Sequence, residues 1–213
     1  VPPKLHRNCS YSCQKILMLE ILVLYYSKGG SVKEMSKIIA RGINSVDGVE
    51  AKLRTVPEVS PLTTQQEGKI PESGDLYANL SDLESCQGLV LGSPTRFGNM
   101  AAPLKYFIDS MSPIWIKGAM EDKPASVFTS SGSVHGGNES TLLSMQLPLL
   151  HLGMLIMGIP YSTPSLSSTV SGGTPYGSSH VGGDSNENDL TSDEKSICFA
   201  QGERIALLVK KIN

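Results

Sequence analysis

The sequence predicts an α/β fold, a doubly wound parallel sheet of five strands with helices on both faces. Short apolar runs, typical of strands buried on both faces, occupy residues 16–26, 88–93, 123–130 and 154–158. Residues 49–55 instead alternate apolar with charged side chains, which is the pattern of an edge strand. Amphipathic segments separate these runs, and three of the runs lead directly into loops rich in glycine and serine.

Length and charge restrict the class of protein. The chain has 213 residues, 39% of them hydrophobic and 18% charged, and a formal net charge of −2. These values predict one globular domain, which we place at 18–213, and they give no electrostatic reason to expect nucleic acid or a membrane surface as a partner. Residues 1–17 carry no periodicity, so we expect them to be a disordered or expression-derived extension.

The four cysteines are too few and too scattered to form a disulfide scaffold. Cys86 and Cys198 read as buried or half-buried thiols of a cytoplasmic protein. Cys9 and Cys13 lie in the extension and have no partners at zinc spacing, so we predict no metal site.

The first strand and helix meet at the loop 27–32. The run 16–26 is too short to cross a membrane. After the loop, apolar side chains recur at spacings of three and four and predict a helix; they are Val32, Met35, Ile38, Ile39 and Ile43. A loop at this junction offers free N–H groups and the positive end of a helix dipole, which suits a phosphate. Since no Walker motif is present, a phosphate without magnesium fits better than a nucleoside triphosphate. An ordinary turn with Ser31 as helix N-cap remains the alternative.

The middle of the chain repeats this unit twice. We expect a polar surface insertion at 58–74 and a short helix at about 75–86, before the strand 88–93. That strand leads into residues 94–99 and a helix over 100–111. The strand 123–130 leads into the loop 129–137 and a helix over 139–152, which Gly153 can end in the left-handed conformation.

The C-terminal part begins with a segment of little periodicity, residues 159–190, which is rich in Ser, Gly, Thr and Pro. A loop of this length in a compact domain is usually functional or part of an interface. We expect Tyr161, Leu166 and Tyr176 to be exposed on it unless another subunit covers them. The last helix spans about 191–211, with Thr191 and Glu194 at capping-box spacing.

Ligands of such sheets bind at the carboxyl ends of the strands. The loops 27–32, 94–99 and 129–137 would meet there. Glycine and serine in all three, with Arg96 and Phe97 in the second, suggest a ligand with a phosphate at one end and a flat ring at the other, as when flavodoxin binds FMN.

Six segments give the chain a family resemblance; they read LVLYYSKGG (22–30), GSPTRFGNM (92–100), SPIWIKGA, SSGSVHGGNEST (130–141), HLGM (151–154) and GGTPYGSSHVGGD (172–184). Together they resemble the WrbA family of flavodoxin-like NAD(P)H:quinone oxidoreductases. The resemblance runs from about residue 18 to the C-terminus. It implies a flavodoxin-like sheet of order 2-1-3-4-5, FMN as cofactor, NADH or NADPH as co-substrate, and a homotetramer in which 159–190 contributes to neighbouring sites.

The resemblance also assigns residues. Two side chains, His151 and Trp115, would line the space above the flavin ring in which nicotinamide and quinone bind alternately. Trp115 and Gly29 would contact the substrate. The FMN-binding residues would be Ser27, Lys28, Gly29, Gly30, Ser31, Val32, Pro94, Thr95, Arg96, Phe97, Gly98, Asn99, Ser130, Ser131, Gly132, Ser133, Gly136, Gly137 and His151. Because His151 closes the helix that follows the loop 129–137, we expect its imidazole near the carboxyl edge of the sheet, as a proton donor to quinone.

The chain departs from the family pattern at two positions. Gly29 stands where relatives often have an aromatic residue, and Leu152 where a second histidine is common. Lys28 adds a positive charge beside the phosphate loop.

Each assigned side chain also has a structural alternative. Arg96 could form a surface ion pair, Trp115 could fill the core, and His151 could complement a helix dipole. His135 and His180 lie in glycine-rich loops, where histidine is more often solvated than catalytic.

Three functions are compatible with these observations. The leading one is two-electron reduction of quinones by NAD(P)H through FMN in a ping-pong mechanism. A flavodoxin-type one-electron carrier is a second, although carriers that steer to basic partners normally have a strongly acidic surface. An oligomeric flavin-binding regulatory protein is the third.

Overall fold

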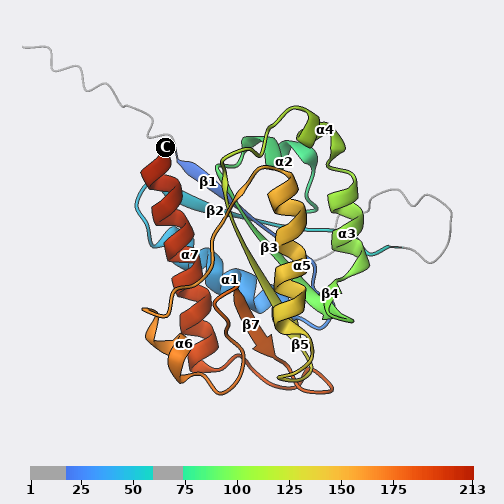
Figure 1. The fold of residues 1–213 in the computed structure, drawn as a ribbon, viewed down its shortest axis with the longest axis vertical. Helices are drawn as coiled ribbons and strands as arrows, with labels where there is room; N and C mark the ends of the chain where they lie inside the picture. Colours follow the sequence, from blue (N-terminus) through green and yellow to red (C-terminus); the bar gives the residue numbers. More distant parts are fainter. Residues whose placement is uncertain (1–17, 60–73) are drawn as a thin grey trace, which may run out of the picture.

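The computed structural model describes residues 18–59 and 74–213 as a parallel sheet between two layers of helices (Figure 1). The expected extension 1–17, with Cys9 and Cys13, and most of the expected insertion 58–74 lie outside the described residues. The elements in chain order are β1 (Leu19–Tyr25), α1 (Ser31–Asn44), β2 (Val49–Thr55), α2 (Leu80–Ser85), β3 (Gly88–Arg96), β4 (Asn99–Met100), α3 (Ala102–Asp109), α4 (Ser112–Ile116), β5 (Pro124–Ser131), α5 (Asn138–His151), β6 (Leu155–Ile156), α6 (Pro164–Ser168), β7 (Ser178–Val181) and α7 (Ser192–Ile212).

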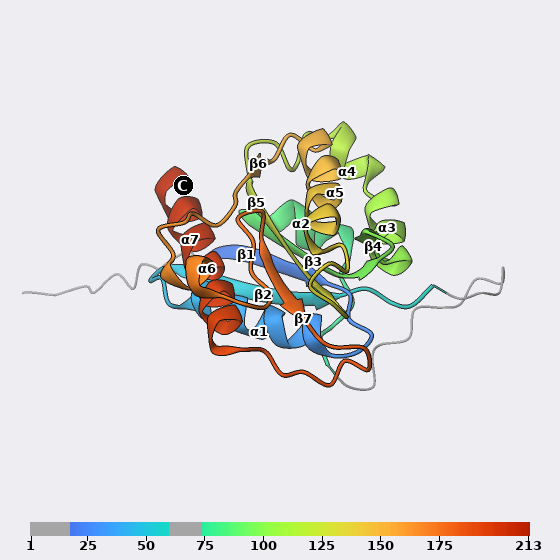
Figure 2. The ribbon, with the colours of Figure 1, turned by 60° about the horizontal axis from the view of Figure 1, so that its bottom comes forward.

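The sheet has the predicted order. Its main path is β2-β1-β3-β5-β6 with all neighbours parallel, which is the order 2-1-3-4-5 of the five expected strands. Successive residues of β1 point to opposite faces, so Leu22 and Leu24 enter one apolar core and Ile21, Val23 and Tyr25 enter the other. Figure 2 shows α1 and α7 on one side of the sheet and α3, α4 and α5 on the other.

The far edge of the sheet differs from the prediction. The expected strand 154–158 is reduced to β6, which pairs only with the first two residues of β5. β7 takes the same position beside the carboxyl half of β5, from Phe128 to Ser131. The segment 159–190 is therefore not one long loop, since it contains both α6 and β7. The sequence did not indicate β7 because its buried residues are polar: the Ser178 N–H donates to Gln201 Oε1, and Ser179 Oγ accepts from the Gly173 N–H.

Two glycines allow α1 and α7 to pack closely on one face. A Cβ on Gly42 would lie 2.1 Å from the Phe199 carbonyl oxygen, and one on Gly202 would lie 2.0 Å from that of Ile39. Any side chain at either position would push the helices apart. α1 is thereby fixed against the sheet with its N-terminus at the carboxyl edge.

Helix ends follow local signals. Thr191 and Glu194 form the predicted capping box at the start of α7, and Gly153 follows α5 with φ 76°. The helix expected at 75–86 begins only at Leu80, because Asn79 caps it reciprocally with Asp82.

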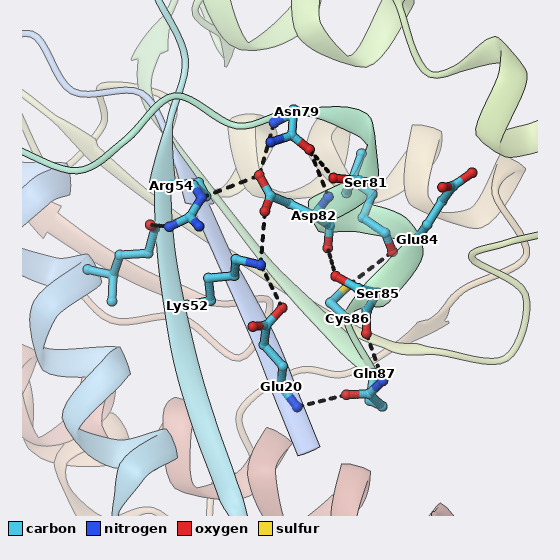
Figure 3. A network of polar contacts seen from close by, with 12 residues as sticks. Glu20, Lys52, Arg54, Asn79, Ser81, Asp82, Glu84, Ser85, Cys86 and Gln87 are labelled. Carbon is cyan, nitrogen blue, oxygen red and sulfur yellow. Dashed lines mark hydrogen bonds and ion pairs between the residues drawn. The ribbon is translucent and has the colours of Figure 1, made fainter. Parts of the chain in front are cut away.

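A chain of four charges holds the edge strand β2 (Figure 3). Lys52 Nζ lies 3.1 Å from Glu20 and 2.9 Å from Asp82, and Arg54 Nε lies 3.3 Å from the second oxygen of Asp82. Burial alone would raise the pKa of Asp82, but the Asn79 N–H and the two cations outweigh it and lower the pKa. This network ties α2 to β1 and β2.

Candidate functional site

The loop between β1 and α1 has the geometry of an anion site. Gly30 stands at the N-cap with φ 95°, and Ser31 is already the first helical residue, so the alternative of Ser31 as N-cap is wrong. Ser27 Oγ instead accepts hydrogen bonds from the N–H groups of Gly30 at 3.2 Å and Lys33 at 3.3 Å. Within residues 18–59 and 74–213, no acceptor is found for the N–H groups of Ser31 and Val32. These two donors are left for a ligand at the helix N-terminus.

A pocket of about 350 Å³ opens at this carboxyl edge, and we call it the cradle. Three of its walls come from the predicted loops. Its lining residues are Ser27, Lys28, Gly29, Ser31, Val32, Pro94, Thr95, Arg96, Ser130, Ser131, Gly132, Gly183, Asp184, Ser185 and Asn186. The structure thus brings together most of the residues that were assigned to FMN. Gly30, Phe97, Gly98, Asn99, Ser133, Gly136 and Gly137 do not line the cradle.

The second wall ends in a tight hairpin. β3 extends three residues beyond the predicted strand and pairs antiparallel with β4, so that Phe97 and Gly98 form the turn, with φ of 52° and 75°. Positive φ at both central residues defines a type I′ turn, which normally uses Asn-Gly. The Phe97 side chain is fully exposed. An exposed aromatic residue held in a left-handed conformation marks this tip as a candidate contact for a ligand or partner.

The fourth wall was not expected. It consists of residues 183–186, which follow β7, and Asn186 reaches across to the phosphate loop. Its Oδ1 accepts from the Ser31 hydroxyl at 2.6 Å, and its Nδ2 donates to the Gly29 carbonyl at 2.8 Å. A Cβ on Gly29 would lie 3.1 Å from the Asn186 side chain, so a larger residue at position 29 would crowd this asparagine. No local sequence signal connects residues more than 150 positions apart.

The expectation that His180 is solvated is wrong. The residue lies on β7 opposite Ser130, is 1% exposed, and its Nδ1 is 2.9 Å from Glu194 Oε2. Glu194 is fully buried and also accepts from the Ser171 hydroxyl and from the N–H groups of Gly172, Val181 and Thr191. Burial would raise the pKa of Glu194, but these hydrogen bonds, led by that from His180, hold the pKa at about 2. His135, in contrast, is exposed as expected.

His151 and Trp115 lie together, but not at the cradle. α5 starts at the carboxyl edge and runs back across the sheet, so its last residue His151 is at the amino edge; two residues later the Gly153 carbonyl accepts from the Asp122 N–H, just before β5. The expectation that His151 lies near the carboxyl edge is therefore wrong within one chain. With Trp115 it lines a separate groove of about 330 Å³, which also includes Met111, Pro148 and Leu152. Both side chains are exposed, so neither fills the core.

Cys86 and Cys198 are both buried and free, and burial raises the pKa of the Cys198 thiol to about 12. In the described part of the chain, no three His, Cys, Asp or Glu side chains gather as metal ligands. No helix among the described residues is long and apolar enough to span a membrane.

Comparison with known proteins identifies relatives that align over more than nine tenths of the chain. A family model described as NADPH-dependent FMN reductase matches residues 19–165. Two curated proteins named NAD(P)H dehydrogenase (quinone) are each 36% identical to the chain. The one from Syntrophobacter fumaroxidans aligns over 91% of this chain and 98% of its own length, and the one from Geobacter sulfurreducens over 92% and 100%.

Solved structures share the fold. A flavodoxin, WrbA-like protein from Agrobacterium tumefaciens superimposes with a TM-score of 0.65 at 19% identity, covering 92% of this chain and 99% of that one. A flavodoxin from the domain Archaea superimposes with a TM-score of 0.61, also at 19% identity, covering 90% and 99%. At such identities the likeness concerns the fold alone.

Proposed function

Because the chain belongs to the NADPH-dependent FMN reductase family, we propose that it is an NAD(P)H:quinone oxidoreductase that works with FMN bound in the cradle. Membership agrees with the resemblance read from the sequence. The observation that carries the proposal is the cradle itself, because three loops from separate parts of the chain meet there at the carboxyl ends of β1, β3 and β5.

The donors of the cradle fit a flavin mononucleotide. The free N–H groups of Ser31 and Val32, with the Ser27 and Ser31 hydroxyls, suit a phosphate, and Lys28 adds a positive charge. Beyond them, Pro94 and Ser130 are partners on the neighbouring strands β3 and β5, and the residues that follow each of them continue this wall of the pocket, against which a flat polar ring could lie. The Ser31 hydroxyl must leave Asn186 to bind the phosphate, while the Ser27 hydroxyl still has its own hydrogen to donate.

When bound, FMN would supply the redox chemistry, the relay of a hydride equivalent from a nicotinamide to a quinone, which also takes up one proton to become the hydroquinone. The chain supplies position and charge. The phosphate loop would fix one end of the cofactor, and the Arg96 guanidinium, which donates to its own neighbour's carbonyl at Thr95, would add positive charge at the other end. Thr95, Thr129 and Thr141 share a chain of hydroxyl hydrogen bonds that holds this wall in place.

We further propose that the active form is a homotetramer. Within one chain the groove of His151 and Trp115 and the cradle lie at opposite edges of the sheet, so only a second copy could bring that groove over a flavin. Large apolar side chains are exposed around this groove, on α3, α4 and α5; they are Tyr106, Trp115, Ile116, Leu143, Leu147 and Leu150. Large exposed apolar side chains on neighbouring helices are typical of an interface.

The segment 159–190 can contribute less to the interface than expected. Tyr161 and Tyr176 are exposed on it, but Leu166 is buried against Ile159 and Ile197. In the assembly, the exposed His151 imidazole would stand where it could give a proton to a quinone bound over a neighbour's flavin. We propose a cytoplasmic location because the thiols of Cys86 and Cys198 are free.

The proposal is tested by an absorbance spectrum of the purified protein, followed by steady-state reduction of benzoquinone with NADH and NADPH. We expect flavin bands and rapid turnover to hydroquinone. Bound flavin with only single-electron exchange would refute the oxidoreductase in favour of a carrier. Flavin without turnover would refute it in favour of a regulatory protein. A monomer by light scattering with FMN bound at micromolar concentration would refute the tetramer.

A further inference from the structure

A second cavity of about 460 Å³ lies beside the cradle and has no role in the proposed function. The two cavities share the wall formed by Gly29, Ser31 and Asn186. The far side of the second cavity is formed by Glu34 of α1, His180 of β7, the residues 187–190, and Lys195 of α7. A ligand that leaves the cradle over Asn186 would enter this cavity directly.

His180 points to a ligand in the second cavity. The imidazole is 1% exposed and its Nδ1 side faces Glu194, so the opposite edge of the ring, which carries Nε2, is the part that lines the cavity. Because the ionised Glu194 only accepts hydrogen bonds, Nδ1 carries the hydrogen of this bond, and Nε2 is the ring nitrogen left to pair with a ligand. No described residue donates to Nε2. A ring nitrogen at a cavity wall that no described residue pairs is available for a hydrogen bond with a ligand or water.

The charge of the second cavity limits what that ligand can be. Three carboxylates, Glu34, Glu187 and Asp189, face one cation, Lys195. Glu187 accepts from the Ser185 N–H, whereas Glu34 and Asp189 form no ion pair within the described residues. The carboxylates are acceptors, and a hydroxyl can pair with Nε2 either as donor or as acceptor, so the cavity suits a group that presents hydroxyls and carries no negative charge.

We propose that the second cavity binds the adenosine-side ribose of a nicotinamide dinucleotide without a 2′-phosphate, so that the enzyme selects NADH over NADPH. This inference rests on the proposed function. An unsubstituted ribose offers two hydroxyls that can donate to Glu34 and Asp189 and pair with Nε2 of His180. A 2′-phosphate offers only acceptors and two negative charges, which the carboxylates repel and the single Lys195 cannot neutralise.

The first test is equilibrium binding to the full-length, FMN-saturated protein, in which the cradle is filled. The probes are AMP and adenosine 2′,5′-bisphosphate, which differ only in the 2′-phosphate. We expect AMP to bind about tenfold more tightly. The double variant Glu34→Gln, Asp189→Asn should reduce this ratio to about threefold or less. Glu139→Gln, an exposed carboxylate at the start of α5 outside both cavities, should keep the wild-type ratio. Equal affinities in the wild type, or an unchanged ratio in the double variant, would overturn the proposal.

A second variant separates ligand binding from folding. In His180→Asn, the amide nitrogen can replace Nδ1 as donor to Glu194, but nothing replaces Nε2. We expect AMP to bind about tenfold more weakly with little change in the thermal midpoint. Unchanged AMP affinity in this variant would remove His180 from the site.

Turnover distinguishes this inference from the proposed function. Normal quinone reduction with equal kcat/KM for NADH and NADPH, and no preference for AMP, refutes the NADH site alone. A preference for AMP in a protein that reduces no quinone supports the second cavity as a ribose site and refutes the oxidoreductase.

Discussion

Replacing Phe97 by asparagine should stabilise the chain while impairing its activity. Phe97 is the first central residue of the β3–β4 turn, at φ 52°, and its side chain is fully exposed. The left-handed conformation costs an ordinary L-residue about 1–2 kcal/mol, whereas asparagine adopts it readily. Since the exposed ring has no packing to lose, Phe97→Asn should raise the free energy of unfolding by about 1 kcal/mol, and the thermal midpoint by about 2–4 °C in a chain of this size.

The assay is thermal unfolding of the FMN-free protein, in parallel with benzoquinone turnover of the FMN-loaded protein. Turnover should fall, because a strained conformation is normally kept only where the side chain is needed for function, and here that side chain is the exposed ring. Tyr106→Asn is the matched control: Tyr106 is an exposed aromatic residue within α3, so its loss relieves no left-handed strain and should not raise the midpoint. A midpoint that falls in Phe97→Asn would refute the reasoning, because it would show that the ring is packed in the native assembly.

Three further predictions concern the cradle, the groove and the buried carboxylate. Ser27→Ala removes a phosphate donor and the acceptor of the Gly30 and Lys33 N–H groups. The affinity for FMN, measured by titration, should therefore fall by about ten- to a hundredfold, and wild-type affinity would refute the role of Ser27 in binding the phosphate. His151→Ala should lower flavin reoxidation by quinone about 10²–10⁴-fold in stopped flow if the imidazole acts as general acid, and undiminished reoxidation with FMN bound would remove it from the mechanism. The pKa of Glu194 is lowered from 4.5 to about 2, which corresponds to a contribution of about 3 kcal/mol to the free energy of unfolding. This contribution is complete above pH 4.5 and is lost as the pH falls toward 2. Denaturant unfolding should therefore show Glu194→Gln destabilised at pH 7 and the difference from wild type shrinking below pH 4.5; a difference independent of pH would contradict this.

Most of the cradle could be predicted because each of its three expected loops follows a strong local pattern. The apolar run before Ser27 and the spaced apolar residues after Val32 place the phosphate loop between a strand and a helix whatever the rest of the chain does. The same holds for the strands that end at Arg96 and Ser131. Parallel strands bring such loops to one edge of the sheet, so their meeting followed from the fold class.

The expected placement of His151 is wrong for a geometric reason that the predicted fold class already contains. A helix that begins at the carboxyl edge must end at the amino edge, so the residue that closes α5 lies about one helix length from the loop that opens it. For a helix of 14 residues that length is about 21 Å. The groove of His151 and Trp115 can therefore serve a flavin only across an interface between subunits.

The fourth wall of the cradle depends on one carboxylate, Glu194, whose burial the sequence does not indicate. Glu194 was recognised as half of a capping box, which accounts for one of its hydrogen bonds, that from the Thr191 N–H. Its other donors come from residues 171, 172, 180 and 181, and they fix β7 beside β5 and start the segment that carries Asn186 to the phosphate loop. A buried carboxylate needs such donors, and only the folded chain supplies them. His180 is thus held in place by its hydrogen bond to Glu194. Any variant that removes the hydrogen bonds of this carboxylate should therefore alter both cavities at the carboxyl edge.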